Sequence, residues 1–242
     1  MSLSDIKFDE ENSLILVHKG ISIHGDLLIP HDAQSIVLFA FHSASERFHP
    51  GNRSIASEFH RSGLGTFLVD LLTEEEAQGL KNANPCVSTG KRPRARHGFV
   101  IKEHRTVDFL AERAGVVIEW LKKNPSTRSF KLGCWASDSS AAACLRAAVE
   151  HWDLKALCLK GSRIDLAESF LPLIQPATLW IACRDNADTA RMMEKKFQLL
   201  ACPKKLTMVP GGERDFDEPG AGVMAAKYAK DWFLRYFTKE AS

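Results

Sequence analysis

Side chains that could act as a nucleophile, an acid or a base stand within a few residues of the ends of three apolar runs: His42, Asp138, Ser139 and Asp185. Small residues surround the middle pair in the string Ala136-Ser137-Asp138-Ser139-Ser140-Ala141. A nucleophile on a sharp strand-to-helix turn needs small neighbours, because the turn is strained and the backbone packs closely there. Asp138 and Ser139 both satisfy this pattern, and aspartate tolerates unusual backbone angles better than most residues. The sequence therefore offers two candidate nucleophiles at one turn.

The composition is that of an ordinary globular protein. The 242 residues are 45% hydrophobic and 26% charged, with a formal net charge of +2. This charge is too small to indicate nucleic-acid or membrane binding. No apolar run approaches the roughly 20 residues that span a bilayer, and Met1–Asn12 is too polar for a signal peptide. We therefore expect a cytoplasmic protein without nucleic-acid or membrane partners.

The six cysteines form no CxxC pair and no zinc-binding spacing. We expect neither a metal nor a cofactor, and no disulfide in a chain without an export signal. Cys134 and Cys183 stand near the ends of apolar runs, where a thiol of low pKa would be nucleophilic or would contact a ligand. The alternative, which the sequence favours, is that both are small buried residues.

Apolar runs alternate with helical patterns along the chain. Predicted strands cover Leu14–Val17, Ile21–Ile29, Ser35–Phe41, Gly65–Leu71, Phe130–Trp135, Leu154–Lys160, Thr178–Cys183 and Lys205–Val209. Predicted helices cover Asn52–Arg61, Arg105–Lys122, Ser139–His151, Arg163–Leu171, Thr189–Leu200 and Ala221–Phe237. This alternation after an initial hairpin predicts one α/β domain over residues 1–242. Its mostly parallel central sheet would have helices on both faces and an N-terminal antiparallel hairpin.

Several strings resemble the dienelactone hydrolase-like branch of the α/β-hydrolases, over roughly Gly20 to Phe237. The most specific strings are Gly63-Leu64-Gly65-Thr66, Leu68 to Glu76 (LVDLLTEEE), Phe109-Leu110-Ala111-Glu112-Arg113, Val209-Pro210-Gly211 and Asp217-Glu218-Pro219-Gly220. The resemblance implies the α/β-hydrolase fold. It says less about activity, because activity depends on the residues of the site.

The resemblance also implies where a Ser–Asp–His triad would stand in this chain. Asp138 occupies the nucleophile position, where the family has serine. Asn186 occupies the acid position, with Asp185 one residue away as an alternative, and Arg214 occupies the position of the histidine base. No histidine follows His151. In the oxyanion loop, His42 replaces the glycine that would let backbone N–H groups approach the substrate.

These replacements predict a catalytically degenerate homologue. The guanidinium of Arg214 stays protonated and is no base, and loss of the serine or the histidine of such a triad lowers kcat by about 10⁶. Asp138 and Arg214 are instead expected to form an ion pair. The leading interpretation is a non-hydrolytic protein that binds a small molecule, for which an anion is one candidate, or a protein partner. Ligand contacts are expected from five residues: Ser43, Cys134, Trp135, Ser139 and Cys183.

Two alternatives stay open. An active hydrolase of esters, thioesters or dienelactones would use rearranged residues, either Asp138 as nucleophile or Ser139 with His42 as a relocated base. A purely structural or partner-binding domain would have its pocket filled by Trp135, His42 and the Asp138–Arg214 pair. The sequence does not indicate an oligomeric state.

A polar stretch over about residues 73–103 carries an excess of basic residues. It is expected to form a variable loop, or a lid over part of the pocket mouth. Its candidate anion-binding side chains are Arg92, Arg94, Arg96 and His97.

Overall fold

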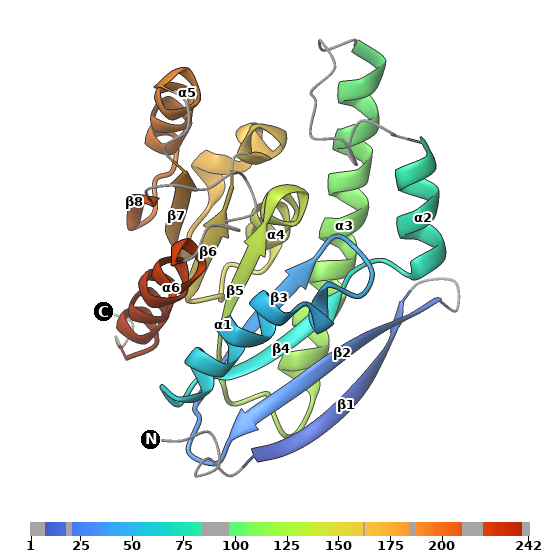
Figure 1. Cartoon of the computed structure of the whole chain (residues 1–242), viewed down its shortest axis with the longest axis vertical. Helices are drawn as coiled ribbons and strands as arrows, with labels where there is room; N and C mark the ends of the chain where they lie inside the picture. Colours follow the sequence, from blue (N-terminus) through green and yellow to red (C-terminus); the bar gives the residue numbers. More distant parts are fainter. Residues whose placement is uncertain are drawn as a thin grey trace.

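The computed structural model describes residues 8–17, 21–83, 97–161, 163–183, 187–209 and 220–238. Eight strands form one sheet in the order β1-β2-β4-β3-β5-β6-β7-β8 (Figure 1). Their bounds are β1 Phe8–Val17, β2 Ile21–Pro30, β3 Ser35–Phe41, β4 Gly65–Asp70, β5 Lys131–Ser137, β6 Ala156–Lys160, β7 Ala177–Cys183 and β8 Lys204–Val209.

The strand directions confirm the predicted sheet. The strands from β4 to β8 in this order are parallel, β2 is antiparallel to β4, and β1 pairs with β2 as an antiparallel hairpin. β1 is longer than the apolar run indicates, since it starts at Phe8 instead of Leu14. The hydrogen bonds between strands use only backbone groups, so polar residues can form them as readily as apolar ones. Asp9 to Asn12 of β1 therefore pair with Asp26 to Ile29 of β2 in antiparallel register.

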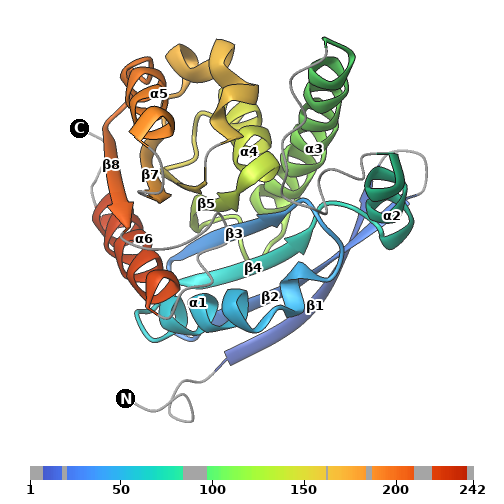
Figure 2. The same cartoon turned by 45° about the horizontal axis from the view of Figure 1, so that its top comes forward.

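Helices cover both faces of the sheet, as Figures 1 and 2 show. α1 and α6 lie together on one face, and α3 and α4 pack against each other on the opposite face. The helices are α1 Pro50–His60, α2 Glu74–Ala83, α3 His97–Lys123, α4 Asp138–Glu150, α5 Ala187–Gln198 and α6 Ala221–Thr238, with the 3-10 helices η3 Glu46–Phe48 and η4 Arg163–Leu173. Within the described ranges, no helix combines the length and apolarity that crossing a bilayer requires.

The central strand β3 contributes to two hydrophobic cores. Ile36, Leu38 and Ala40 point into the core under α3 and α4, whereas Val37, Phe39 and Phe41 point into the core under α1 and α6. Every residue of β3 is buried. This two-sided burial explains why the strand is a continuous apolar run instead of an alternating pattern.

The predicted loop over residues 73–103 is wrong at both ends. Residues 74–83 form α2, and α3 starts at His97, eight residues before the predicted start at Arg105. The start of α2 is a capping box, in which the Thr73 N–H donates to Glu76 Oε2 (2.9 Å) and the Glu76 N–H donates to Thr73 Oγ1 (3.3 Å). The spacing Thr73-x-x-Glu76 was visible in the sequence, although the surrounding residues are polar. Residues 84–96 lie outside the described part of the chain.

One partly buried ion pair connects two of the strings that carry the family resemblance. Arg113 of α3 is only 2% exposed, and its two Nη atoms each donate to Glu76 at 2.6 Å. Arg113 Nη1 also donates to the backbone carbonyl of Leu71, directly after β4 (2.6 Å). The guanidinium therefore fastens α2 and α3 to the end of β4.

Candidate functional site

The turn between β5 and α4 holds its first helical residue in a strained conformation. Ser137 is extended (φ −128°), whereas Asp138 has a left-handed φ of 50°. Such a φ is uncommon for a residue other than glycine. The Asp138 carboxylate lies at the N-terminus of α4, where the helix dipole favours negative charge. This sharp strand-to-helix turn is called the elbow below.

Gly161 makes room for the Asp138 side chain at the end of the neighbouring strand β6. A Cβ atom on Gly161 would lie 3.0 Å from Asp138 Oδ1, and the φ of +95° at Gly161 also requires glycine. Its N–H donates to the carbonyl of Ile181 (3.1 Å), and its carbonyl accepts from Trp180 Nε1 (2.7 Å). Hydrogen bonds to two residues of β7 therefore hold Gly161 in place beside the elbow.

The loop after β3 is held by one carboxylate, Asp70, at the end of β4. The backbone N–H groups of Ser45 and Arg47 donate to Asp70 at 2.9 and 3.1 Å, so they bracket Glu46. Ser45 has a left-handed φ of 70°. Burial raises the pKa of the Asp70 carboxyl, and hydrogen bonds from Arg47 and Ser45 oppose this shift.

Charged side chains behind this loop form a network. Arg47 Nε donates to Asp70 (3.1 Å), and Arg47 Nη1 donates to Asp26 of β2 (2.6 Å). Arg53 of α1 pairs with the second oxygen of Asp26. The guanidinium of Arg47 also lies 4.0 Å from the ring centroid of Phe48. β2, β4 and α1 thus all hold the loop that carries His42 and Glu46.

A pocket of about 820 Å³, called the elbow pocket, opens at the carboxyl ends of β3, β5 and β6. Its inner end is lined by residues from the elbow, the β3 loop and β6: His42, Glu46, Ser137, Asp138 and Lys160. Its outer end lies between α1 and α6 and includes Glu58, Arg61, Val223, Lys227 and Lys230. Among the described residues, the pocket therefore has an inner end with two carboxylates and an outer end in which basic residues outnumber acidic ones.

The electrostatics of Glu46 show that the charged groups of the inner end act on one another. Burial raises the pKa of the Glu46 carboxyl above its usual range. The nearby His42 and Lys160 oppose this shift, while Asp70 and Asp138 add to it. His42 Nδ1 lies 4.0 Å from Glu46 Oε1. A buried carboxyl with a shifted pKa in a pocket is a candidate for a functional group.

The structure brings His42 and Asp138 to one pocket, but it excludes two expected ligand contacts. Trp135 is 2% exposed and packs against Phe39 in the core under α1 and α6. Cys134 is fully buried on the opposite face of β5, with its Sγ 2.8 Å from that of Cys144. Both residues lie within β5, whose side chains point into the two cores, so we correct the prediction that they contact a ligand.

The remaining predicted residues lie beside the pocket or outside the described part of the chain. Ser43 and Ser139 are half-buried and adjacent in sequence to His42 and Asp138, but they are not among the residues that line the pocket. Cys183 ends β7 and His97 begins α3, and their side chains are not described. Outside the described residues lie Arg92, Arg94, Arg96, Asp185, Asn186 and Arg214.

Sequence reasoning missed Glu46 and Lys160. Lys160 is the last residue of a predicted strand, and Glu46 stands four residues after His42. Asking which charged residues end or follow each parallel strand would have found Lys160. No local pattern indicates Glu46, because its position depends on Asp70.

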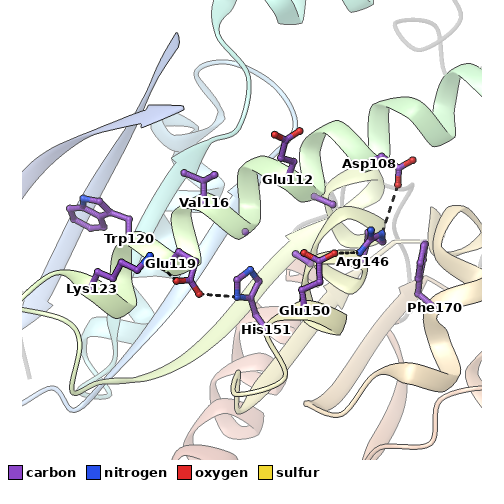
Figure 3. Close-up of a pocket in the computed structure, with 13 residues that line it drawn as sticks. Asp108, Glu112, Val116, Glu119, Trp120, Lys123, Arg146, Glu150, His151 and Phe170 are labelled. Carbon is purple, nitrogen blue, oxygen red and sulfur yellow. Dashed lines mark hydrogen bonds and ion pairs between the residues drawn. The ribbon is translucent and has the colours of Figure 1, made fainter. Parts of the chain in front are cut away.

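A second hollow of about 1150 Å³ lies between α3 and α4 (Figure 3). Several of its charged side chains pair with one another, since Arg146 Nη1 lies 2.8 Å from Glu150 and His151 Nδ1 lies 3.3 Å from Glu119. The lining residues come from α3, from α4 with the residue that follows it, and from η4, and none ends a strand. We therefore take the elbow pocket as the candidate site.

Searches against known proteins give structural and sequence relatives, although no family model matches the chain. The crystal structure of a dienelactone hydrolase from Anabaena variabilis has a TM-score of 0.80 and 32% identity, over 95% of this chain and 99% of that one. Est1E from Butyrivibrio proteoclasticus has a TM-score of 0.67 at 13% identity, over 94% and 99% of the two chains, and supports the fold alone.

A curated relative from Mycobacterium tuberculosis, named "Putative phosphoribosyl transferase", is 30% identical over 216 residues. The match covers 88% of this chain but 44% of the relative, so the chain spans less than half of that protein's length. The nearly full-length likeness to the Anabaena enzyme agrees with the strand order and with the sharp turn after β5. The chain is therefore an α/β-hydrolase of the dienelactone hydrolase-like family.

Proposed function

We propose that the chain is a degenerate dienelactone hydrolase homologue that binds a small molecule in the elbow pocket and does not hydrolyse carboxylic esters. The observation that carries this proposal is the aspartate, in place of serine, at the elbow. Attack of the Asp138 carboxylate on an ester carbonyl would form an anhydride, which is more reactive than the ester itself. Acyl transfer to Asp138 is therefore unfavourable, and Arg214 at the base position offers no general base.

Backbone strain supports ligand binding over a purely structural role. Ser45 and Asp138 are the two non-glycine residues with left-handed φ within the described ranges. Asp138 lines the elbow pocket, and Ser45 immediately precedes the lining residue Glu46. Strained residues persist where the surrounding structure enforces them, and they cluster at functional sites. Among the described residues, Trp135 packs in the core and does not fill the pocket.

The charges of the outer end favour an elongated ligand with an anionic group. Glu58 pairs with Arg61 at 3.2 Å and with Lys230 at 2.7 Å, and Lys227 also lines this end. Among the described lining residues of the outer end, these three cations outnumber the one anion. A protein partner that inserts an acidic side chain would use the same contacts, and it is the alternative occupant.

We do not extend phosphoribosyl transfer to this chain. That activity appears only in the name of the M. tuberculosis relative, and more than half of that protein has no counterpart here. The fold and the elbow belong to the family of the Anabaena enzyme, which the chain matches nearly end to end.

The test is to restore the family's catalytic residues. The wild-type chain should neither turn over short aryl esters nor react with a fluorophosphonate. The triple variant Asp138→Ser, Asn186→Asp, Arg214→His should gain labelling at residue 138. Ser139→Ala in the wild-type background is the matched control, because Ser139 is the other candidate nucleophile.

Ester turnover by the wild-type chain that Ser139→Ala abolishes would refute the proposal. Binding is tested separately by the melting temperature in the presence of small carboxylates and phosphomonoesters. A rise of Tm that is lost when Lys227 and Lys230 are both replaced by Gln supports an anionic ligand at the outer end. If none of these anions raises Tm, the proposal that the ligand is anionic is refuted.

A further inference from the structure

His42 and Glu46 form a pair in the elbow pocket that serine-type hydrolysis does not use. Both are half-buried, at 31% and 29% side-chain exposure, and both line the pocket beside Asp138. His42 Nδ1 is buried, and no described residue lies within hydrogen-bond distance of it; Glu46 Oε1 is 4.0 Å away. A buried ring nitrogen without a partner needs an explanation. Catalytic hydrogen bonds are often long without substrate and shorten in the complex.

The backbone of Glu46 is held on both sides. Asp70 accepts the N–H groups of the preceding and following residues, and Asn52 Nδ2 donates to the Glu46 carbonyl (3.0 Å). The left-handed φ of Ser45 means that the loop keeps this shape at an energetic cost. The restraint fixes where the Glu46 carboxyl enters the pocket.

We infer that the elbow pocket carries a hydrolytic unit for epoxides, in which Asp138 is the nucleophile, His42 the base for water and Glu46 the residue that positions His42. The inference rests on the proposed function in one respect, namely that a small molecule occupies the elbow pocket. The inference concerns attack of Asp138 on an sp³ carbon of the substrate. The proposed function excludes attack on an acyl carbon, so the two statements are compatible.

The chemistry of a carboxylate nucleophile selects this substrate class. A carboxylate that attacks an sp³ carbon forms an ordinary alkyl ester, which is stable enough to form and reactive enough for water to hydrolyse. The electrophile must carry its own leaving group, and the polar inner end suits an oxygen leaving group. The Lys160 ammonium, which lines this end, is the proton donor that a ring-opened oxygen requires.

The two steps balance as follows. In the first, an Asp138 oxygen attacks one epoxide carbon, the C–O bond breaks, and the ring oxygen takes a proton from Lys160, which leaves a hydroxyalkyl ester. In the second, His42 removes a proton from water, and the oxygen of that water attacks Asp138 Cγ. The ester C–O bond at Cγ breaks, and the departing oxygen takes the proton from His42. The diol leaves, the Asp138 carboxylic acid gives up its remaining proton, and Lys160 regains one, so the net reaction is epoxide plus water to diol.

The experiment uses styrene oxide and 1,2-epoxyhexane with the whole chain. The wild type should form the diol. In a single turnover in H₂¹⁸O, the ¹⁸O label should enter the side chain of residue 138 and not the diol. His42→Gln should slow ester hydrolysis by about 10²–10⁴-fold, so that protein carrying one added epoxide mass accumulates. Asp138→Asn should form neither adduct nor diol.

The variant Glu46→Gln tests whether Glu46 positions His42 for the hydrolytic step or only supports the fold of the loop. It should leave the rate of adduct formation unchanged and slow hydrolysis of the adduct by between about 10-fold and 10⁴-fold. Matched controls come from the hollow between α3 and α4, because Asp108→Asn, Glu119→Gln and His151→Gln make the same chemical changes outside the pocket. These three should behave as the wild type.

The inference is overturned if neither epoxide modifies residue 138 in the His42→Gln variant, or if the ¹⁸O label appears in the diol. Either result is compatible with the proposed function, provided that anions still raise Tm and carboxylic esters are not hydrolysed. Conversely, ester hydrolysis that depends on Ser139 would refute the proposed function, whatever the epoxides do.

Discussion

Lowering the pH from 7.5 to 5.0 should destabilise the protein through one buried histidine. His60 ends α1, is 7% exposed, and its Nε2 lies 2.7 Å from Thr66 Oγ1 of β4. Burial, assisted by the positive charge of Arg53, lowers the pKa of His60 from 6.5 to about 4. The neutral imidazole is therefore favoured in the folded state, and the charged form in the unfolded state below pH 6.5.

The size of the effect follows from proton linkage. Each pKa unit corresponds to about 1.4 kcal/mol, so a shift from 6.5 to about 4 is worth about 3 kcal/mol. This stability is fully present above pH 6.5 and is lost progressively as the pH falls toward 4, because the unfolded chain binds the proton first. At pH 5.0 the loss through His60 should be about 2 kcal/mol.

Urea unfolding at both pH values tests this expectation, with His60→Gln as the comparison. Glutamine retains a group that reaches Thr66 but does not titrate. The carboxyls of Glu46 and Asp70 have raised pKa values and contribute in the opposite direction, but they are present in both proteins and cancel in the difference. If both proteins lose the same free energy of unfolding between pH 7.5 and 5.0, the reasoning about His60 is refuted.

Three further substitutions test features around the site. Glu76→Gln removes the carboxylate that pairs with the buried Arg113 guanidinium and should lower the free energy of unfolding by about 1–3 kcal/mol, whereas an effect below about 0.5 kcal/mol by urea titration would contradict the pair's importance. Gly161→Ala places a Cβ at a φ of +95° and 3.0 Å from Asp138 Oδ1; it should cost about 1–3 kcal/mol in the same assay. Asp70→Asn replaces an acceptor by a donor beside backbone N–H groups and should cost about 1–3 kcal/mol. It should also abolish the ligand-induced rise in Tm, and a variant that keeps this rise would show that the loop needs no such anchor.

The sheet could be predicted from the sequence because buried parallel strands are continuous apolar runs. β3 is the clearest case, since its seven residues supply two cores. The elbow was predictable for a different reason, because small residues surround Asp138 at a change from strand to helix. Both signals are local in sequence.

The features that escaped prediction depend on contacts between distant residues. The carboxylate of Asp70 holds the loop around Glu46 from 25 residues away, and Arg113 pairs with Glu76 across 37 residues. No periodicity in either segment reveals such pairs. α2 was missed for a simpler reason, because its capping box lies within a polar stretch that has the composition of a loop.

The position of β8 at one end of the strand order has a consequence for solubility. Within the described ranges, β8 pairs with β7 alone, so its outer edge presents unpaired backbone groups to any extended chain. The strand begins with Lys204 and Lys205, and Lys205 is exposed. A charge on an edge strand makes pairing with a second sheet unfavourable. An apolar residue in place of Lys205 should therefore favour edge-to-edge assembly at this end of the sheet.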